Sequence, residues 1–450
     1  MMNRIAILGA GESGIGAALL AKAKGYEVFV SEFALISEER KALLDAKGIA
    51  YEDGGHSAEK LLTFPEVIKS PGIPYAAPMV KQIMEKGISL IDELEFASRF
   101  SNGKVIAITG TNGKTTTTLL TYHLMKEAGM DVGLAGNVGD SWARQLVDGD
   151  RAWWVLEVSS FQIDGFKKLK PQVAVILNIT PDHLDRYEYR LENYIHSKLN
   201  LVKNMDNQGH LIYFKEDQYI WRGLKELSVQ ANIHQISIAQ KVENGAYFDG
   251  SQIHYSTGKG FQIIDTASLP LKGHHNMVNV MAAAQAVIAA GADEERAMKG
   301  LTTFKNAAHR MEKVAELNGV EFINDSKGTN VNATYYALAA YQSKPIIWIA
   351  GGVDKGNDYN ELAEVVKSSV KALICLGKNN EKLKFAFGQM VPQVMETQEM
   401  RQAVQMAQQI AQAGDVVLLS PACSSFDLFK NYMDRGEKFI EAVKEMETVK

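Results

Sequence analysis

One segment limits what this chain can fold into more than any other. The apolar run 105–109 leads directly into Gly110-Thr111-Asn112-Gly113-Lys114-Thr115-Thr116. A strand, a glycine-rich turn and a helix start in that order form a phosphate-binding loop, because backbone N–H groups and the helix N-terminus surround the anion. Lys114 adds a full positive charge and Thr115 a hydroxyl for Mg²⁺. The segment therefore predicts ATP binding by residues 110–116, and a chance glycine turn is the alternative.

Length, charge and cysteine usage exclude several classes of protein. A chain of 450 residues is too long for a single domain with one hydrophobic core of ordinary size. Its 48 Lys and Arg against 53 Asp and Glu give a net charge of -5, which provides no basic field for nonspecific nucleic-acid binding. The two cysteines, Cys375 and Cys423, exclude a disulfide framework and favour a reducing compartment. With neither a signal-peptide pattern nor an apolar run of spanning length, we expect a cytoplasmic protein without membrane insertion.

Short apolar runs alternate with helical stretches along the chain, which predicts parallel sheets with right-handed crossovers. We expect an α/β protein of three domains, 1–92, 93–302 and 303–450, each a largely parallel sheet flanked by helices. The first and third would be Rossmann-like and the central one P-loop ATPase-like. The polar segment 207–260 predicts strands that decorate the central domain. The apolar runs are 5–8, 28–30, 105–109, 155–158, 173–177, 346–350, 373–376 and 416–419.

A second glycine-rich turn lies near the N-terminus. Gly9-Ala10-Gly11-Glu12-Ser13-Gly14 follows the first apolar run, and Glu32 lies about twenty positions further on, as in the dinucleotide-binding fingerprint. This pattern predicts a nucleotide pyrophosphate at the helix N-terminus with Glu32 near a ribose, and a purely structural turn is the alternative. The loop containing Ser70 and Gly72 follows another strand at the same predicted sheet edge, where ligands bind.

Three further side chains are candidates for metal chemistry. Glu157 follows an apolar run, and Mg²⁺ usually takes one or two protein carboxylates. His183 follows the run 173–177 and could ligate a metal, although a lone histidine is more often a surface residue. Lys198 lies on a predicted helix, where its residue type alone indicates only a solvated amine.

In combination these motifs have a different meaning. GTNGKT, LEVSSFQ, NITPDHLDRY and YIHSK, in this order and spacing, resemble the Mur ligase family, the ATP-dependent amino-acid ligases of peptidoglycan precursor synthesis. The resemblance implies catalytic roles for Lys114, His183 and Lys198, with Lys198 carbamylated by CO₂. It also implies two Mg²⁺ ions, one held by Thr115 and Glu157 and the other by His183 and the carbamate.

The resemblance continues into the second half of the chain. It implies that Asn276 and Asn279 hold adenine, and their spacing of three places both on one helix face. It further implies that Arg310 contacts adenine or phosphate and that Asp325 contacts the ribose.

The resemblance covers the whole chain and implies a ligase that adds D-glutamate to UDP-N-acetylmuramoyl-L-alanine through an acyl phosphate. A related ligase for a different amino acid is the nearest alternative; a P-loop switch without ligation activity and an NAD-dependent dehydrogenase are more distant ones. We expect a monomer. The implied UDP-substrate contacts are Gly11, Glu12, Ser13, Glu32, Ser70, Gly72, Asn137, Ser159 and Gln162. The implied D-glutamate contacts are Thr329, Lys355, Ser425 and Phe426.

Overall fold

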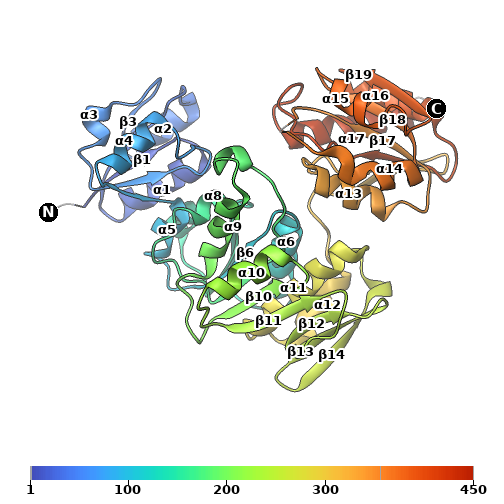
Figure 1. Cartoon of the computed structure of the whole chain (residues 1–450). Coiled ribbons are helices and arrows are strands. Elements are labelled where there is room, and N and C mark those ends of the chain that lie inside the picture. Colours follow the sequence, from blue (N-terminus) through green and yellow to red (C-terminus); the bar gives the residue numbers. More distant parts are fainter. Residues whose placement is uncertain (1–2, 355, 449–450) are drawn as a thin grey trace. The chain divides into compact units, whose positions relative to one another are not determined.

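The computed structural model describes residues 3–354 and 356–448. They form two compact units that divide between Phe304 and Lys305, and they contain three β-sheets flanked by helices (Figure 1). The predicted α/β class with largely parallel sheets is confirmed. The division of the first unit near Asp92 stays a prediction.

The N-terminal sheet has the strand order β3-β2-β1-β4-β5, and every neighbouring pair is parallel. Helix α1 begins immediately after the turn that follows β1. A Cβ atom at Gly14 would collide with the carbonyl oxygen of Gly9, so this helix can start so close to the strand only with glycine there. The strands are β1 (Arg4–Leu8), β2 (Glu27–Ser31), β3 (Ala50–Glu52), β4 (Glu66–Lys69) and β5 (Ser89–Ile91). The helices are α1 (Glu12–Ala23), α2 (Glu38–Ala46), α3 (Ala58–Leu61), α4 (Pro78–Glu85) and α5 (Glu93–Ser98).

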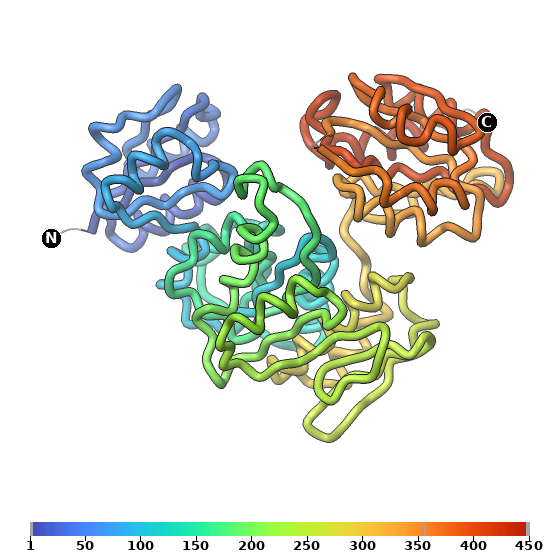
Figure 2. The backbone as a smooth tube through the Cα atoms, viewed as in Figure 1, coloured from blue at the N-terminus to red at the C-terminus, as the bar shows by residue number. Residues whose placement is uncertain are grey.

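The central sheet has the order β14-β13-β12-β11-β10-β9-β6-β8-β7 and is parallel from β7 to β12. Its last two strand pairs are antiparallel, and Figure 2 shows them as consecutive hairpins. The segment 207–260 therefore does more than decorate this domain, because β10 and β11 continue the parallel sheet. The strands are β6 (Lys104–Thr109), β7 (Val132–Gly136), β8 (Trp153–Glu157), β9 (Val173–Ile176), β10 (His210–Phe214), β11 (Asn232–Ser237), β12 (Gly245–Phe248), β13 (Gln252–Thr257) and β14 (Gly260–Asp265).

Buried carboxylates join these two sheets into one unit. Asp92 caps α5 by accepting from the N–H of Leu94 over 2.9 Å. Glu93 accepts from the Ser141 hydroxyl over 2.8 Å, and Glu95 accepts from the N–H of Leu169 over 2.9 Å. The helices of the central region are α6 (Lys114–Glu127), α7 (Trp142–Asp148), α8 (Ser160–Ile163), α9 (Leu191–Leu199), α10 (Gln218–Glu226), α11 (His274–Ala289) and α12 (Glu294–Lys299), with short 3-10 turns η1 (Leu184–Arg186), η2 (Asn200–Val202), η3 (Thr266–Ser268) and η4 (Gly300–Thr302).

The second unit contains the sheet β15-β16-β20-β17-β18-β19, which is parallel except for the edge strand β15. The strands are β15 (Glu312–Leu317), β16 (Val320–Asn324), β17 (Ile346–Ala350), β18 (Val370–Leu376), β19 (Gln393–Thr397) and β20 (Val416–Leu419). The helices are α13 (Val331–Ala340), α14 (Ala363–Ser369), α15 (Glu381–Phe387), α16 (Met400–Ile410) and α17 (Tyr432–Thr448), with the 3-10 turn η5 (Tyr359–Leu362).

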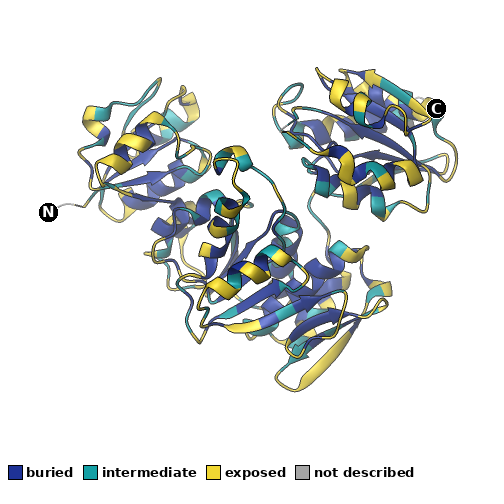
Figure 3. Ribbon diagram, viewed as in Figure 1, coloured by how far each residue is buried: buried dark blue, intermediate teal, exposed yellow. Residues whose placement is uncertain are grey.

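The central strands are buried on both faces, as is typical of parallel sheets covered by helices. In β6 every residue after Lys104 is buried, and Figure 3 shows the buried strands beneath helices whose outer faces are exposed. Among the described residues, no helix is both long enough and apolar enough to cross a bilayer.

Candidate active site

The phosphate-binding loop lies between β6 and α6, as predicted. Gly113 has a φ of 83°, in the left-handed region that favours glycine, and it is the N-cap of α6. Helix α6 begins at Lys114, whose ammonium group donates to the carbonyl oxygens of Gly110 and Thr111, both over 2.8 Å. Thr115 is buried in the first turn of the same helix. The sequence thus places a cation and a hydroxyl at the helix end that attracts anions.

Two residues to which the sequence analysis assigned no individual role hold this loop. Asn178 follows β9, the neighbour of β6, and its side-chain oxygen accepts from the N–H of Asn112 over 2.8 Å. The hydroxyls of Tyr194 and Thr111 are 3.2 Å apart and hydrogen-bonded. The sequence feature that could have indicated this role of Asn178 is its position directly after a strand, because the carboxyl ends of adjacent parallel strands lie at one sheet edge.

Glu157 ends β8, on the other side of β6. The side chain is 1% exposed; Oε1 accepts from the amide of Asn137 over 2.7 Å, while Oε2 is buried without a hydrogen-bond partner among the described residues. An unsatisfied buried carboxylate oxygen is costly unless a cation or a donor completes it. Together with the Thr115 hydroxyl it fits the oxygen ligands that Mg²⁺ prefers.

Lys198 is buried beside the phosphate-binding loop. Its ammonium group, on α9, donates to the carbonyl oxygen of Gly110 over 2.9 Å, and the residue is 1% exposed. Burial lowers the pKa of Lys198 well below its usual range, and the nearby charge of Lys114 lowers it further. The solvated amine that its residue type alone suggested is therefore wrong for this position, which favours a neutral amine.

His183 precedes η1 in the loop after β9. Its φ of 52° is left-handed, and its ring lies edge-on to Phe161 with centroids 5.2 Å apart. Nε2 lies 3.7 Å from a carboxylate oxygen of Asp182. Among residues 3–354 and 356–448, no three His, Cys, Asp or Glu side chains gather as a preformed metal centre. A cation here would need further oxygens from water or a phosphate, as Mg²⁺ commonly does.

The two asparagines predicted to hold adenine are neighbours at the start of α11. The Asn279 amide donates to Asn276 Oδ1 over 3.1 Å, and the Thr117 hydroxyl donates to Asn279 Oδ1 over 3.1 Å. A Cβ atom at Gly113 would collide with Asn279, so glycine at this position lets α11 approach the phosphate-binding loop.

The N-terminal domain has a cavity of about 840 Å³. Six of the nine predicted UDP-substrate residues line it: Gly11, Glu12, Ser13, Glu32, Ser70 and Gly72. The carboxylate of Glu32 accepts from the N–H of Ala10 over 2.6 Å and of Ala34 over 3.0 Å, so it also fixes the first glycine turn. Asn137, Ser159 and Gln162 lie elsewhere, around Glu157, where Ser159 and Gln162 form the capping box of α8.

In the second unit, three loops meet at the carboxyl ends of the adjacent strands β16, β20 and β17. The Ser420 hydroxyl donates to Asp325 Oδ2 over 2.8 Å, and the N–H of Val353 donates to the carbonyl oxygen of Ser424 over 2.8 Å. Burial raises the pKa of Asp325 to about 6, although the positive charge of Arg310 opposes this shift.

The predicted D-glutamate residues belong to these loops. Thr329 is half-buried after Asp325, Ser425 is buried and Phe426 is 72% exposed. Lys355 lies outside the described residues. Arg310 has a buried Nε without a hydrogen-bond partner among the described residues, which suits a ligand contact.

Comparison with known proteins identifies this combination of sites. Sequence profiles match for the MurD N-terminal domain over residues 4–79, the Mur ligase middle domain over 108–287 and the Mur ligase glutamate ligase domain over 309–423. The UDP-N-acetylmuramoylalanine--D-glutamate ligase of Christiangramia forsetii is 47% identical over 99% of this chain and 100% of its own length. The enzyme of that name from Bacteroides fragilis is 45% identical over the same shares.

Solved structures of lower identity share the fold. UDP-N-acetylmuramate-alanine ligase MurC from Thermotoga maritima has a TM-score of 0.63 at 17% identity, covering 98% of this chain and 99% of its own. MurF ligase from the same organism, in complex with ADP, also has a TM-score of 0.63, at 16% identity, covering 96% of this chain and 99% of its own. The matched domains and full-length relatives agree, and the chain belongs to the Mur ligase family.

Proposed function

We propose that this protein is an ATP-dependent ligase that joins the amine of D-glutamate to the free carboxylate of UDP-N-acetylmuramoyl-L-alanine. The observation that carries the proposal is the end-to-end similarity to relatives named UDP-N-acetylmuramoylalanine--D-glutamate ligase, at 47% and 45% identity. A Mur-type ligase for another amino acid is the alternative. The proposal includes a monomeric, cytoplasmic enzyme and the three domains 1–92, 93–302 and 303–450.

The reaction has two bond-forming steps. A carboxylate oxygen of the UDP-linked alanine attacks the γ-phosphorus of ATP, the bond to the bridging β,γ oxygen breaks, and an acyl phosphate and ADP result. The D-glutamate amine then attacks the acyl carbon, a C–N bond forms, and phosphate leaves as the amine loses a proton. Both steps depend on positioning and charge stabilisation.

Lys114 supplies charge stabilisation in the first step. Its hydrogen bonds to the Gly110 and Thr111 carbonyls hold the ammonium group over the loop. Phosphate oxygens are stronger acceptors than these carbonyls because they carry charge. The ammonium group therefore exchanges carbonyl partners for the γ-phosphoryl oxygens.

Thr115 and Glu157 would hold one Mg²⁺, and His183 with a carbamate on Lys198 would hold a second. Bound Mg²⁺ supplies positive charge against the phosphoryl oxygens. The unpartnered Oε2 of Glu157 supports the first assignment. A neutral amine is the form that reacts with CO₂, giving a carbamate and a released proton, so the lowered pKa of buried Lys198 supports the second.

Further residues bind the three substrates. In this proposal the N-terminal cavity takes the UDP end of the sugar substrate. Asn137, Ser159 and Gln162, which lie around Glu157, would contact its other end. The proposed contacts of ATP, beyond residues 110–116, are Asn276, Asn279, Arg310 and Asp325. Those of D-glutamate are Thr329, Lys355, Ser425 and Phe426.

A phosphate-release assay tests the proposal. The protein is mixed with ATP, Mg²⁺ and UDP-N-acetylmuramoyl-L-alanine, and D-glutamate is compared with L-lysine, D-alanyl-D-alanine and no acceptor. We expect release that depends on D-glutamate, with an amide product detected by mass spectrometry. Release that prefers another acceptor would support the alternative, and release without any acceptor or product would contradict ligation.

A further inference from the structure

The loop Ser70-Pro71-Gly72-Ile73 lines the N-terminal cavity, and two cations hold all four of its carbonyl oxygens. The Lys69 ammonium group donates to the carbonyl of Ile73 over 2.9 Å and, more weakly, to that of Ser70 over 3.3 Å. The Arg186 guanidinium donates to the carbonyl of Pro71 over 3.2 Å and to that of Gly72 over 3.3 Å. Four successive carbonyls held in this way leave the loop little freedom to rotate its peptide planes.

Lys69, which holds two of these carbonyls, is unusually buried for a lysine. It ends the buried strand β4 and is only 3% exposed. A buried ammonium group must be compensated by acceptors or charges. Besides the two carbonyls, the Tyr75 ring lies 4.8 Å from Nζ. The charged groups around it are Asp92 after β5, Asp164 after α8 and Arg186. Burial lowers the pKa of Lys69 to about 8, and burial also raises the pKa of Asp92 and of Asp164.

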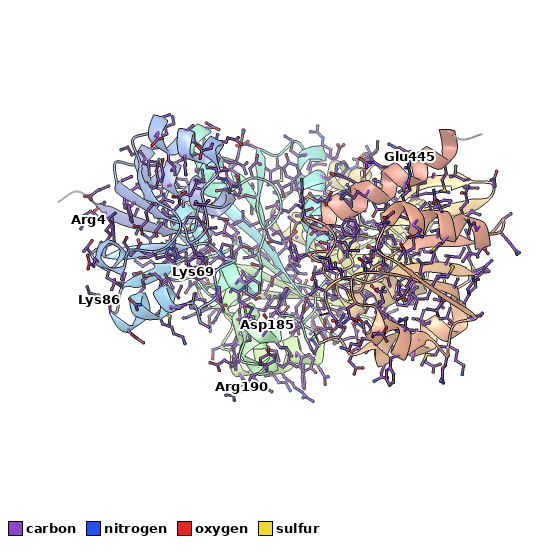
Figure 4. The ribbon with its side chains drawn as sticks, turned by 90° about the horizontal axis from the view of Figure 1, so that it is seen from above. Arg4, Lys69, Lys86, Asp185, Arg190 and Glu445 are labelled. Carbon is purple, nitrogen blue, oxygen red and sulfur yellow. The ribbon has the colours of Figure 1, made fainter. Side chains whose placement is uncertain are left out.

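Arg186 reaches the same loop from the central region. It ends η1, three positions after His183, and its guanidinium lies 4.2 Å from the centroid of the Phe161 ring. The ring supports one face of the guanidinium while the N–H groups at its edge reach the carbonyls. Figure 4 labels Lys69 and Asp185, the residue before Arg186, together with Lys86.

We propose that Lys69 and Arg186 are positioning residues for the UDP end of the sugar substrate. In a trans peptide the C=O and the following N–H point in opposite directions, so holding the Pro71 carbonyl fixes the direction of the Gly72 N–H. Gly72 and the Ser70 hydroxyl can donate to a diphosphate or sugar in this cavity, whereas Pro71 and Pro74 have no N–H. The two cations thus prepare these donors for the ligand before it binds. The inference rests on the proposed function for the identity of that ligand.

Lys69→Met tests the first cation, because methionine has a similar length and no charge. We expect the KM for UDP-N-acetylmuramoyl-L-alanine to rise at least about tenfold, as loss of charge-assisted hydrogen bonds does, while the KM values for ATP and D-glutamate change little. In the wild type this KM should also rise above about pH 8, where Lys69 loses its charge, and Lys69→Met should lack that rise. Lys69→Arg, which keeps a cation, should recover part of the loss.

Lys86→Met is the matched control, since Lys86 also donates to a backbone carbonyl of this domain, that of Leu62 over 3.0 Å, away from the loop. Arg186→Met should raise the KM for UDP-N-acetylmuramoyl-L-alanine as Lys69→Met does. In the double variant the fold-increase in this KM should be smaller than the product of the two single increases. Equal KM increases for all three substrates, or a Lys69→Met protein that behaves like Lys86→Met, would overturn the proposal.

Amide hydrogen exchange separates this inference from the proposed function. Without any substrate, a peptide covering residues 70–77 should exchange faster in Lys69→Met and Arg186→Met than in the wild type or Lys86→Met. If the wild type forms no amide with D-glutamate, the proposed function fails while the exchange experiment still decides whether the two cations hold the loop. If the wild type is active and exchange is unchanged in both variants, only the present inference fails.

Discussion

Lys114 and Lys198 donate hydrogen bonds to one and the same oxygen, the carbonyl of Gly110, over 2.8 and 2.9 Å. Burial and, next, the repulsion from the nearby Lys114 charge lower the pKa of Lys198. This shift favours the neutral amine that the proposed carbamate needs at Lys198, while Lys114 lies at the start of α6, where we propose that phosphate binds. This division of roles follows from burial, because both side chains begin as ordinary lysines.

Replacing Lys114 by alanine should abolish ligation while the protein stays folded. The change removes the cation that stabilises charge on the transferring phosphoryl group, and loss of one such contact costs roughly a hundredfold or more in kcat. Lys126→Ala, at the exposed far end of the same helix, is the control. Steady-state phosphate release measures both, and more than about a tenth of wild-type turnover in Lys114→Ala would show that this loop is not catalytic.

Lys198→Ala should be nearly inactive, and short carboxylates such as acetate or formate should restore part of the activity by replacing the missing anionic ligand. Lys203 is an exposed lysine shortly after α9 and serves as the control. Lys203→Ala should keep its activity and should gain nothing from added carboxylates. Carbon-13 NMR with labelled bicarbonate should give a carbamate signal in the wild type that is missing from Lys198→Ala. A wild type without that signal would refute the carbamate.

The sequence predicted the phosphate-binding loop, Glu157 and the strands around them because these depend on local patterns. Apolar runs mark β6, β8 and β9, and the parallel arrangement then brings their carboxyl ends to one edge. It did not predict that Asn178 holds the loop or that Asn137 holds Glu157, since such partners come from separate segments and many asparagines follow strands.

Burial was the least predictable property of the site. By residue type Lys198 indicated a solvated amine, and Lys69 was given no role, yet Lys69 is 3% exposed and Lys198 is 1% exposed. Their burial depends on long-range packing of α9 and of the loop before Tyr75, which no local pattern encodes. The roles of Lys198 and of the D-glutamate residues came from family resemblance alone.

The histidine pair His210 and His234 should make stability depend on pH. The ring nitrogens of the pair are 2.9 Å apart on neighbouring strands β10 and β11, and Gln285 lies 3.2 Å from the other nitrogen of His234. Burial and, to a smaller extent, the nearby charge of His210 together lower the pKa of His234 from 6.5 to about 4. Between these values the unfolded chain binds the proton and the folded one does not, so stability is lost as pH falls from 6.5 to about 4.

We expect His234 to contribute about 1–3 kcal/mol to this loss, allowing for its partial hydration. Urea unfolding of the wild type, His234→Gln and His254→Gln at several values between about pH 7 and about pH 4 measures it. His254 is the control because it pairs with Asp249 over 2.8 Å. The free energy of unfolding should fall less steeply in His234→Gln than in the other two proteins, and parallel curves would contradict the assignment.

Lys355→Ala should weaken the binding of D-glutamate and leave the other two substrates little affected. D-glutamate brings two carboxylates, and the family resemblance implies that Lys355 contacts one of them. The described part of that turn is fixed beside Ser424 through Val353. Truncating one side of a desolvated charge pair costs roughly 2 to 5 kcal/mol, so the KM for D-glutamate should rise at least about tenfold. The KM values for ATP and the UDP-sugar should change little, because their proposed contacts are Lys114, Asn276 and the N-terminal cavity.

Lys367→Ala is the control, because Lys367 is an exposed lysine on α14. Equal damage to all three KM values would indicate a folding defect, and an unchanged KM for D-glutamate would remove Lys355 from the site and favour a different acceptor.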